Sequence, residues 1–481
     1  QHRSDLVENL QSEGLYYVDL LDAGDLASDP INTEDIWVSF DFSGRDLSGN
    51  IILTRNADDA VLAGSFSKYT HYVPFYRYCG SENSGLMEGT WLAMRRTLTL
   101  GDTYFRNNKD RLGITSPEVT LRYGSKIRLY MPSSVVGNGV EGTGGYEGQE
   151  GYSLSSKRPF IVTMEIRDTV SNPLEREGTD VDDFCELNGG LQIYSKGDDD
   201  TPATEVPEDP EDPEHPYNET SKRWVSACDS IPQVYVNVRY NPAEPRDQLS
   251  FPAPYHVGYE PYVSEASVRD IDMQIAEALK KRFHGEGDDY QKYEGVKALE
   301  ADSVTLDGTA KIWYIGRFLD GFIFDTNIDE VKKIIYGEVA QKGTALDYTP
   351  SSGGMIQAFY YTIPNLKFGQ WAELITTSTN AYGSSGKSGS SSSSTSGSSG
   401  YSSSYLDYLN YLNYANSYYG SGGYYGGYYG GYYGNYYGGY YDSMYGYGYD
   451  SSSTGTTVTT ITTEIPSFTP LIFQLYIEPE D

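Results

Sequence analysis

Long apolar runs, cysteines and histidines are scarce in this chain of 481 residues. No run of about eighteen apolar residues occurs, so the sequence predicts no membrane-spanning helix. Three widely spaced cysteines (Cys79, Cys185 and Cys228) and five scattered histidines form no spacing that is typical of a zinc site. We therefore expect no metal and no cofactor. Three free buried thiols are favoured over one disulfide with a leftover thiol.

Basic residues are outnumbered as well. The chain has 35 Lys and Arg against 68 Asp and Glu, which gives a formal net charge of -33. Phosphate binding requires clustered lysine and arginine, and a surface this acidic repels phosphate. The sequence therefore predicts no nucleic-acid partner.

The chain also lacks an apolar signal core, and it begins with the polar stretch "QHRSDLVENL" without an initiator Met. This beginning favours a processed export product, and a lipid-modified cysteine just before Gln1 would fit it. We expect an exported outer-membrane lipoprotein of a Gram-negative bacterium, with the periplasmic and cell-surface faces both open. Membrane contact would then run only through that N-terminal lipid anchor.

The length exceeds what one hydrophobic core ordinarily serves, so two or three domains are expected. Strand-like segments alternate or cluster β-branched and aromatic residues in "IWVSFDF", "NIILTRN", "KIRLYMP" and "RPFIVTMEIRD". The stretch "TPATEVPEDPEDPEHP" repeats proline and carboxylate, which predicts an extended, solvated loop. The predicted division is an N-terminal segment (1–33), a β-rich domain (34–246) with its acidic loop (201–216), a connecting helix region (247–299) and a second domain (300–481).

Within the later regions, apolar residues at helical spacing from Val268 to Phe283 predict a helix. Strands are predicted again at "TAKIWYIGRF", "GFIFDTN", "KKIIYG" and "WAELITT", and the segment "IPQVYVNVRYNP" is a strand whose sheet is left open. Two more strand segments close the chain in "TTVTTITTEIPSFTPLIFQLYIEPE".

Before those last strands comes a low-complexity stretch that contains "SGGYYGGYYGGYYGNYYGGYY". Because strands follow it, we interpret residues 384–459 as a loop insertion and not as a tail. Such an excursion is tolerable, since loop closure costs only about 0.6 kcal/mol per doubling of length. Paired tyrosines offer large contact areas with few rotatable bonds. They could grip unfolded clients, stack on sugars or order against a partner protein, or they could be a solvated loop.

The segments "AKIWYIGRFLDGFIFDTN", "GGMIQAFYYTIPNLKFGQWAEL", "STNAYGSSG" and "EIPSFTPLIFQLYI" follow one another in a distinctive order. In this order they resemble the FKBP family of peptidyl-prolyl isomerases, over about residues 300–383 and 460–481. The family landmarks are a tyrosine strand followed by G-x-x-F-D, a V-I-x-G-W helix start, the A-Y-G tripeptide, and I-P-P before a last strand with Phe. The resemblance implies an α+β fold in which an antiparallel sheet wraps on a short helix.

The resemblance also implies a proline pocket. Its residues would be Tyr314, Phe324, Asp325, Met355, Ile356, Phe359, Tyr382, Ile465 and Phe473. Asp325, Tyr382 and the Ile356 amide would be the catalytic groups, and the others would bind substrate. Rotation about an X–Pro bond has a barrier of roughly 18–20 kcal/mol because amide resonance is lost. An apolar cup that strips water from the amide favours the twisted state, without a nucleophile or a cofactor.

The sequence departs from the family pattern at several points. Phe359 stands for the usual tryptophan, Ser467 stands for the second proline of I-P-P, and the insertion directly follows A-Y-G. The first strand region resembles the same fold more faintly, as a degenerate FKBP-like domain without the pocket chemistry. Its residues at the pocket positions are Phe42, Ile52, Leu53, Val136 and Val162.

From these observations we expect two FKBP-like domains, the first degenerate and the second with the insertion. The favoured function is a peptidyl-prolyl isomerase or folding chaperone of the cell envelope, acting on proline-containing unfolded or exported polypeptides. One alternative is a non-catalytic scaffold subunit of an outer-membrane protein complex, contacted through the Tyr/Gly-rich loop. A second alternative is a glycan-binding surface lipoprotein.

Overall fold

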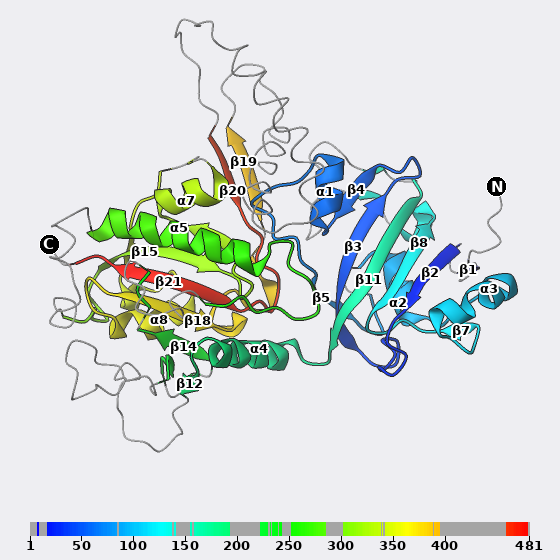
Figure 1. Ribbon diagram of the computed structural model, residues 1–481, viewed down its shortest axis with the longest axis horizontal. Coiled ribbons are helices and arrows are strands. Elements are labelled where there is room, and N and C mark those ends of the chain that lie inside the picture. Colours follow the sequence, from blue (N-terminus) through cyan, green and yellow to red (C-terminus); the bar gives the residue numbers. More distant parts are fainter. Residues whose placement is uncertain are drawn as a thin grey trace, which may run out of the picture.

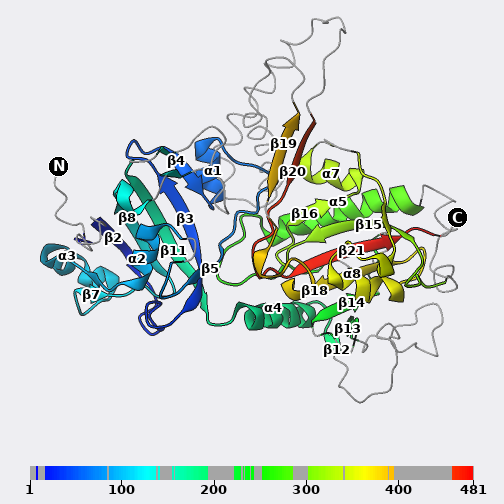
Figure 2. The same ribbon diagram turned by 180° about the vertical axis from the view of Figure 1, so that it is seen from behind.

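The computed structural model shows an α+β protein with two main sheets and helices packed on them (Figures 1 and 2). It describes residues 7–8, 17–83, 86–136, 139–140, 154–155, 158–192, 222–228, 231, 233–238, 240–242, 252–284, 302–337, 339, 342–387, 389–394 and 458–479. The acidic loop (201–216) and the Tyr/Gly-rich run lie outside these residues. Among the described residues, no helix combines the length and apolarity needed to cross a membrane.

The N-terminal part, residues 7–170, is built on a seven-stranded sheet with the order β1-β2-β8-β11-β3-β4, in which β5 also pairs with β3. Its strands are β1 (Val7–Glu8), β2 (Tyr17–Ala23), β3 (Ile36–Arg45), β4 (Ile51–Thr54), β5 (Phe75–Cys79), β8 (Ser125–Met131) and β11 (Phe160–Val170). Its helices are α1 (Ala57–Ala63), α2 (Glu88–Arg95) and α3 (Asp102–Leu112). Two short ribbons complete it, β6 (Leu98–Thr99) with β7 (Glu118–Val119) and β9 (Gly139–Val140) with β10 (Leu154–Ser155).

The C-terminal part, residues 173–479, is built on an eight-stranded sheet with the order β12-β13-β14-β18-β21-β15-β16, in which β17 also pairs with β15. Its strands are β12 (Leu191–Gln192), β13 (Trp224–Ser226), β14 (Val234–Asn237), β15 (Ala310–Arg317), β16 (Ile323–Thr326), β17 (Leu346–Tyr348), β18 (Trp371–Thr376) and β21 (Leu471–Ile477). Its α-helices are α4 (Pro173–Leu187), α5 (Glu265–His284), α7 (Asp329–Tyr336) and α8 (Gln357–Thr362). The ribbon of β19 (Ser390–Ser394) and β20 (Val458–Thr462) projects from it (Figure 1).

The two sheets repeat one topology. The path β2-β8-β11-β3-β4 corresponds to β14-β18-β21-β15-β16, and α1, β5 and α2 occupy the chain positions of α7, β17 and α8. Each part also carries a two-stranded ribbon between the same two strands, β9–β10 in one and β19–β20 in the other. The insertion therefore occupies a point at which the other sheet carries a loop as well.

The burial patterns differ between the sheets. β8 alternates between buried and half-buried residues, whereas all seven residues of β21 are buried. Alternate side chains of a strand face opposite sides of its sheet, so full burial means that both faces are covered. On one face the C-terminal sheet packs against α8, and on the other it packs against α4, α5 and α7.

The predicted domain boundaries differ from the observed sheets. Part of the expected N-terminal segment is β2, which pairs with β8 in the first sheet. The region assigned to a first domain up to residue 246 includes α4 and β12–β14, but β14 pairs with β18 in the second sheet. The strand left open in the sequence therefore belongs to the second sheet. Pairing between segments so distant along the chain leaves no local pattern to detect.

One element prediction is confirmed and another is wrong. The helix predicted from Val268 to Phe283 is α5 (Glu265–His284). The connecting region contains α5, which lies in front of the second sheet in Figure 1 and contributes Ile275 and Leu279 to the core behind it. "KKIIYG" was predicted as a strand and is the end of α7, which Gly337 closes at φ 73° in the left-handed conformation. Among the cysteines, Cys79 and Cys185 are buried and Cys228 is partly exposed.

Candidate proline-binding site

The predicted pocket residues converge on the face of the second sheet that α8 covers. Tyr314 on β15 and Asp325 on β16 lie on adjacent antiparallel strands, and the Tyr314 hydroxyl donates to Asp325 Oδ2 at 3.0 Å. Burial, and then the Asp325 carboxylate beside it, raises the pKa of the Tyr314 hydroxyl. The phenol therefore stays protonated and donates to the carboxylate throughout the physiological pH range.

Three aromatic rings pack together next to this polar pair, and we call this apolar cluster of Phe324, Phe359 and Phe473 the cup. The Phe473 ring centroid lies 5.7 Å from that of Phe324 and 5.2 Å from that of Phe359, in both cases with nearly perpendicular ring planes. Edge-to-face packing of this kind is favourable because ring edges are positive and faces negative. Phe359 is fully buried and lies deepest of the three rings.

Ile356, Ile465 and Met355 take different places around the cup. Ile356 precedes α8 and is buried in the same cluster as the rings, as is Ile465 in the loop before β21. Met355 is 40% exposed and lies at the surface instead. The structure thus brings seven of the nine predicted residues into or against one cluster. Asp325 is bonded to that cluster through the Tyr314 hydroxyl, and Met355 lies outside it.

Tyr382 packs against this cluster in the segment after β18 and is half-buried. Burial and the nearby Asp325 raise the pKa of its hydroxyl, which therefore remains a hydrogen-bond donor at neutral pH. Glu177 of α4 holds the same segment, because its carboxylate accepts bonds from the backbone N–H and, at 2.6 Å, from the hydroxyl of Ser378. Burial raises the pKa of Glu177 to about 7.

One glycine makes the arrangement possible. Gly316 lies opposite Asp325 on β16, and a Cβ at this position would be 2.6 Å from the Phe324 ring. The ring therefore lies directly over the backbone of β15. Gly44 in the first sheet is also covered by a ring, that of Phe160 at 2.3 Å from such a Cβ, although Phe160 lies on β11 and not on β4.

The first sheet repeats this geometry without the polar groups. Gly44 pairs with Leu53 and with Val162, as Gly316 pairs with Asp325 and with Phe473. In the described part of the chain, the carboxylate and the hydroxyl thus occur at these positions in the second sheet (Asp325 and Tyr314) and not in the first (Leu53 and Phe42). Among the described residues, no group of three His, Cys, Asp or Glu side chains could hold a metal ion.

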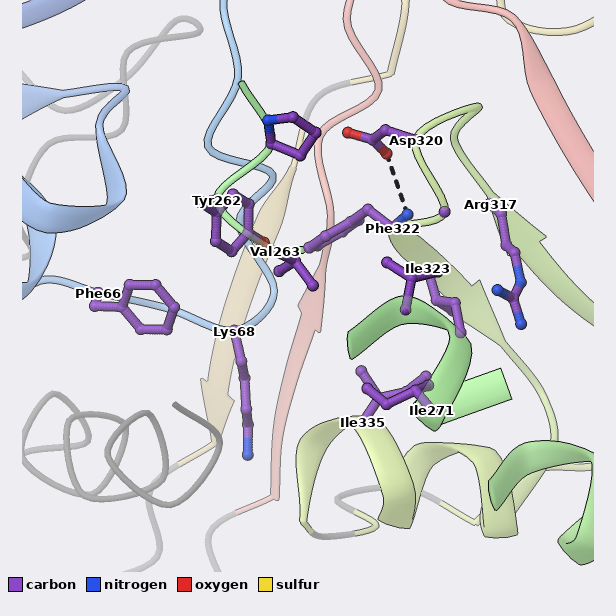
Figure 3. A pocket seen from close by; sticks show the side chains of 13 residues that line it. Phe66, Lys68, Tyr262, Val263, Ile271, Arg317, Asp320, Phe322, Ile323 and Ile335 are labelled. Atoms are coloured by element: carbon purple, nitrogen blue, oxygen red, sulfur yellow. Dashed lines mark hydrogen bonds between the residues drawn. The ribbon is translucent and has the colours of Figure 1, made fainter. Parts of the chain in front are cut away.

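A separate hollow lies where the two parts meet (Figure 3). Phe66 and Lys68 come from the N-terminal part, whereas Tyr262, Phe322 and other apolar side chains come from the C-terminal part. The charged groups at its wall are already used within the protein: Arg317 pairs with Asp272, and the Lys68 amine contacts the carbonyl of Tyr336. We therefore regard the hollow as part of the junction between the two parts.

Comparison with known proteins yields structural matches alone. No family model matches the chain, and no curated protein matches it in sequence. Three FKBP domains of wheat FKBP73 match at 9% identity and a TM-score of 0.21, over 99% of this chain and 98% of that one. A peptidyl-prolyl cis-trans isomerase from Pseudomonas syringae matches at 14% identity and a TM-score of 0.16, over 37% of this chain and 65% of that one. FkpA from Escherichia coli matches at 14% identity and a TM-score of 0.21, over 35% of this chain and 53% of that one. Values this low do not support an inference about function.

Several supporting residues had no signal in the sequence. Phe318 packs on Phe324 with ring centroids 5.1 Å apart, and Tyr348 packs edge-on against Phe359 at 6.0 Å. Two further contacts come from much earlier in the chain. Glu177 bonds to Ser378, and the His71 ring stacks on Phe318. Only the assembled sheet brings them together.

Proposed function

We propose that the C-terminal part is an FKBP-type peptidyl-prolyl cis-trans isomerase that binds X–Pro segments of unfolded polypeptides. The observation that carries the proposal is the cup of three aromatic rings with one hydroxyl–carboxylate pair, Tyr314 and Asp325, at its rim. An apolar cup suits the proline ring, and a few placed polar groups suit the carbonyls on either side of it. The envelope location expected from the sequence remains part of this proposal.

Catalysis would follow from desolvation and fit to the twisted amide. Water hydrogen-bonded to the carbonyl favours the planar resonance form, and the buried rings of Phe324, Phe359 and Phe473 exclude it. The Ile356 N–H and the Tyr382 hydroxyl would hold the flanking carbonyls, while Asp325 faces the carbonyl that rotates. Groups that act more strongly on the twisted amide than on the planar one lower the barrier.

The test is an isomerisation assay on a peptide with a single Leu–Pro bond. We expect the wild type to accelerate isomerisation and Asp325→Ala to lower kcat/KM about tenfold or more, equivalent to about 1.4 kcal/mol of transition-state stabilisation. The matched control is Asp347→Asn, an exposed carboxylate on β17 that lies outside the cup. A wild-type rate equal to the uncatalysed one would refute the enzyme.

A scaffold that binds without catalysis is the second candidate. It is favoured by the near-complete burial of the cup rings: Phe473 packs on both of the others, and Phe318 and Tyr348 cover Phe324 and Phe359 from behind. Proline-peptide binding with no rate acceleration would support this candidate over the isomerase.

A further inference from the structure

Two consecutive residues before the last strand are held by the N-terminal part. Arg55, which follows β4, places Nη2 2.6 Å from Glu464 Oε2, and its side chain is only 3% exposed against 18% for Glu464. The neighbouring Thr463 hydroxyl donates to the Tyr69 carbonyl at 2.7 Å. Charge-assisted bonds in a buried setting are directional and comparatively strong. The segment at 463–464 is therefore fixed against a different sheet from the one that it enters.

This segment leads directly into the wall of the cup. Ile465 is the next residue and is buried with the aromatic rings. Its backbone N–H and carbonyl exchange two 2.8 Å hydrogen bonds with Lys387, whose amine lies 5.5 Å from the centre of the Tyr382 ring. Holding Glu464 in place thus fixes Ile465 and, through Lys387, the segment that carries Tyr382.

A second contact from the same N-terminal loop reaches the back of the cup. Arg55 also donates to the His71 carbonyl at 3.4 Å. The His71 ring stacks on Phe318 with centroids 4.4 Å apart, and Phe318 packs on Phe324. His71 Nε2 lies 2.6 Å from Asp320 Oδ2, with both side chains buried. Arg55 is therefore bonded to the segments that support two separate cup residues.

We propose that the N-terminal part, which lacks the hydroxyl–carboxylate pair, is a positioning module for the proline cup. Arg55 is its positioning residue, and it acts on the Ile465 wall through Glu464. This role rests on the proposed function of the C-terminal part. It also gives the degenerate repeat a task that needs none of the missing pocket groups.

The variants separate positioning from folding. Arg55→Met removes the ion pair but keeps the length of the side chain, and Arg55→Lys keeps the charge. Glu464→Gln removes the pair from its more exposed partner, so it serves where Arg55→Met is unstable. The matched control is Arg45→Met, because Arg45 pairs with Asp59 at 2.7 Å within the N-terminal part.

The first measurement is the split between KM and kcat for a tetrapeptide with one Leu–Pro bond. We expect Glu464→Gln to raise KM about tenfold and Arg55→Met to raise it at least as much, because only the arginine variant also loses the bond to the His71 carbonyl. The double variant should match Arg55→Met, since both single variants remove the same ion pair. Arg55→Lys should recover most of the affinity, and Arg45→Met should stay within about twofold of wild type. A folded Arg55→Met protein with wild-type KM would overturn the positioning role.

The second measurement does not depend on catalysis. The methyl resonances of Ile465, assigned in protein labelled at isoleucine methyl groups, should shift in Arg55→Met and in Glu464→Gln but not in Arg45→Met. Shifted resonances in a protein with no isomerase activity would refute the enzyme and retain the positioning role. Unshifted Ile465 resonances in a protein with isomerase activity would refute the positioning role and retain the enzyme.

Discussion

At the residue scale, one exchange illustrates the chemical difference between the two sheets. Leu53 and Asp325 both lie opposite a glycine at the same point of the repeated topology, yet one is aliphatic and the other acidic. An ionised carboxylate is costly to bury without partners. Asp325 is only half-buried and accepts a hydrogen bond from the Tyr314 hydroxyl, whereas Leu53 is buried. The burial of each site therefore suits the residue that it carries.

Glu373 on β18 supplies a pH-dependent prediction. Burial raises its pKa to about 7 from an ordinary 4.5, although Gln474 and Asn237 both hydrogen-bond to it. Between these pH values the folded protein keeps a proton that the unfolded chain has released. The contribution of Glu373 to the free energy of unfolding should therefore fall as pH rises from 4.5 to about 7, by about 3 kcal/mol, and then level off.

The measurement is urea unfolding at several pH values for wild type and Glu373→Gln. The amide cannot ionise, so the decline between pH 4.5 and 7 should shrink. Glu330→Gln serves as the control because Glu330, on α7, is accessible and pairs with Arg282 of α5. An unchanged pH profile in Glu373→Gln would show that this carboxylate does not contribute the decline.

At the element scale, the contact between β15 and the Phe324 ring can be tested against its own repeat. Gly316→Ala forces the ring away from the strand, and Gly44→Ala does the same to Phe160 in the first sheet. Overpacking of this kind typically costs about 1–3 kcal/mol. Both variants should lose comparable stability in thermal unfolding. Only Gly316→Ala should lower isomerase activity per folded molecule, and equal losses in both would argue against the cup.

The elements also show what the sequence can predict. β3, β8, β11, β15 and β21 were predicted because their apolar residues have strand spacing within one short segment. The residues that became the cup could be named because they follow a family order. Met355 could not be placed in this way, because its exposure depends on how the segment before α8 packs.

The remaining elements depend on distant partners. β14 is four residues long and buried on both faces, and its partner β18 lies well over a hundred residues later. In α7, Val331, Ile334 and Ile335 are helical neighbours, but a short run such as "KKIIYG" is consistent with strand or helix. The bonds that Glu177 makes with Ser378 and that Arg55 makes with Glu464 likewise join residues that are far apart in the sequence.

At the scale of the whole molecule, the junction predicts how the protein unfolds. His71 and Asp320 form a buried pair across it, Tyr69 stacks on Tyr336 at 4.3 Å, and Trp37 meets Phe468 edge-on at 4.8 Å. We therefore expect one cooperative calorimetric transition. His71→Ala removes one hydrogen-bond partner of the buried Asp320 carboxylate, which keeps Tyr259 and the Phe322 N–H. This loss should cost about 1–3 kcal/mol and separate the unfolding of the two parts.

The control for this prediction is His256→Ala. His256 lies near the same junction, where its ring is 5.4 Å from that of Tyr259, and it forms no part of the His71–Asp320 pair. That variant should keep the single transition. Two transitions already present in the wild type would mean that the junction does not couple the two parts.

The position of β21 means that the chain could be split into two fragments that reassemble. This strand lies between β18 and β15 in the middle of the second sheet, yet it follows the whole insertion in the chain. A break anywhere between residues 395 and 457 would leave a separate C-terminal peptide that contains β20 and β21 and still supplies a central strand. Such a peptide would stay bound through its hydrogen bonds to both neighbours and its buried side chains. The protein could therefore be made as two complementing fragments, with reassembly itself reporting that the sheet is intact.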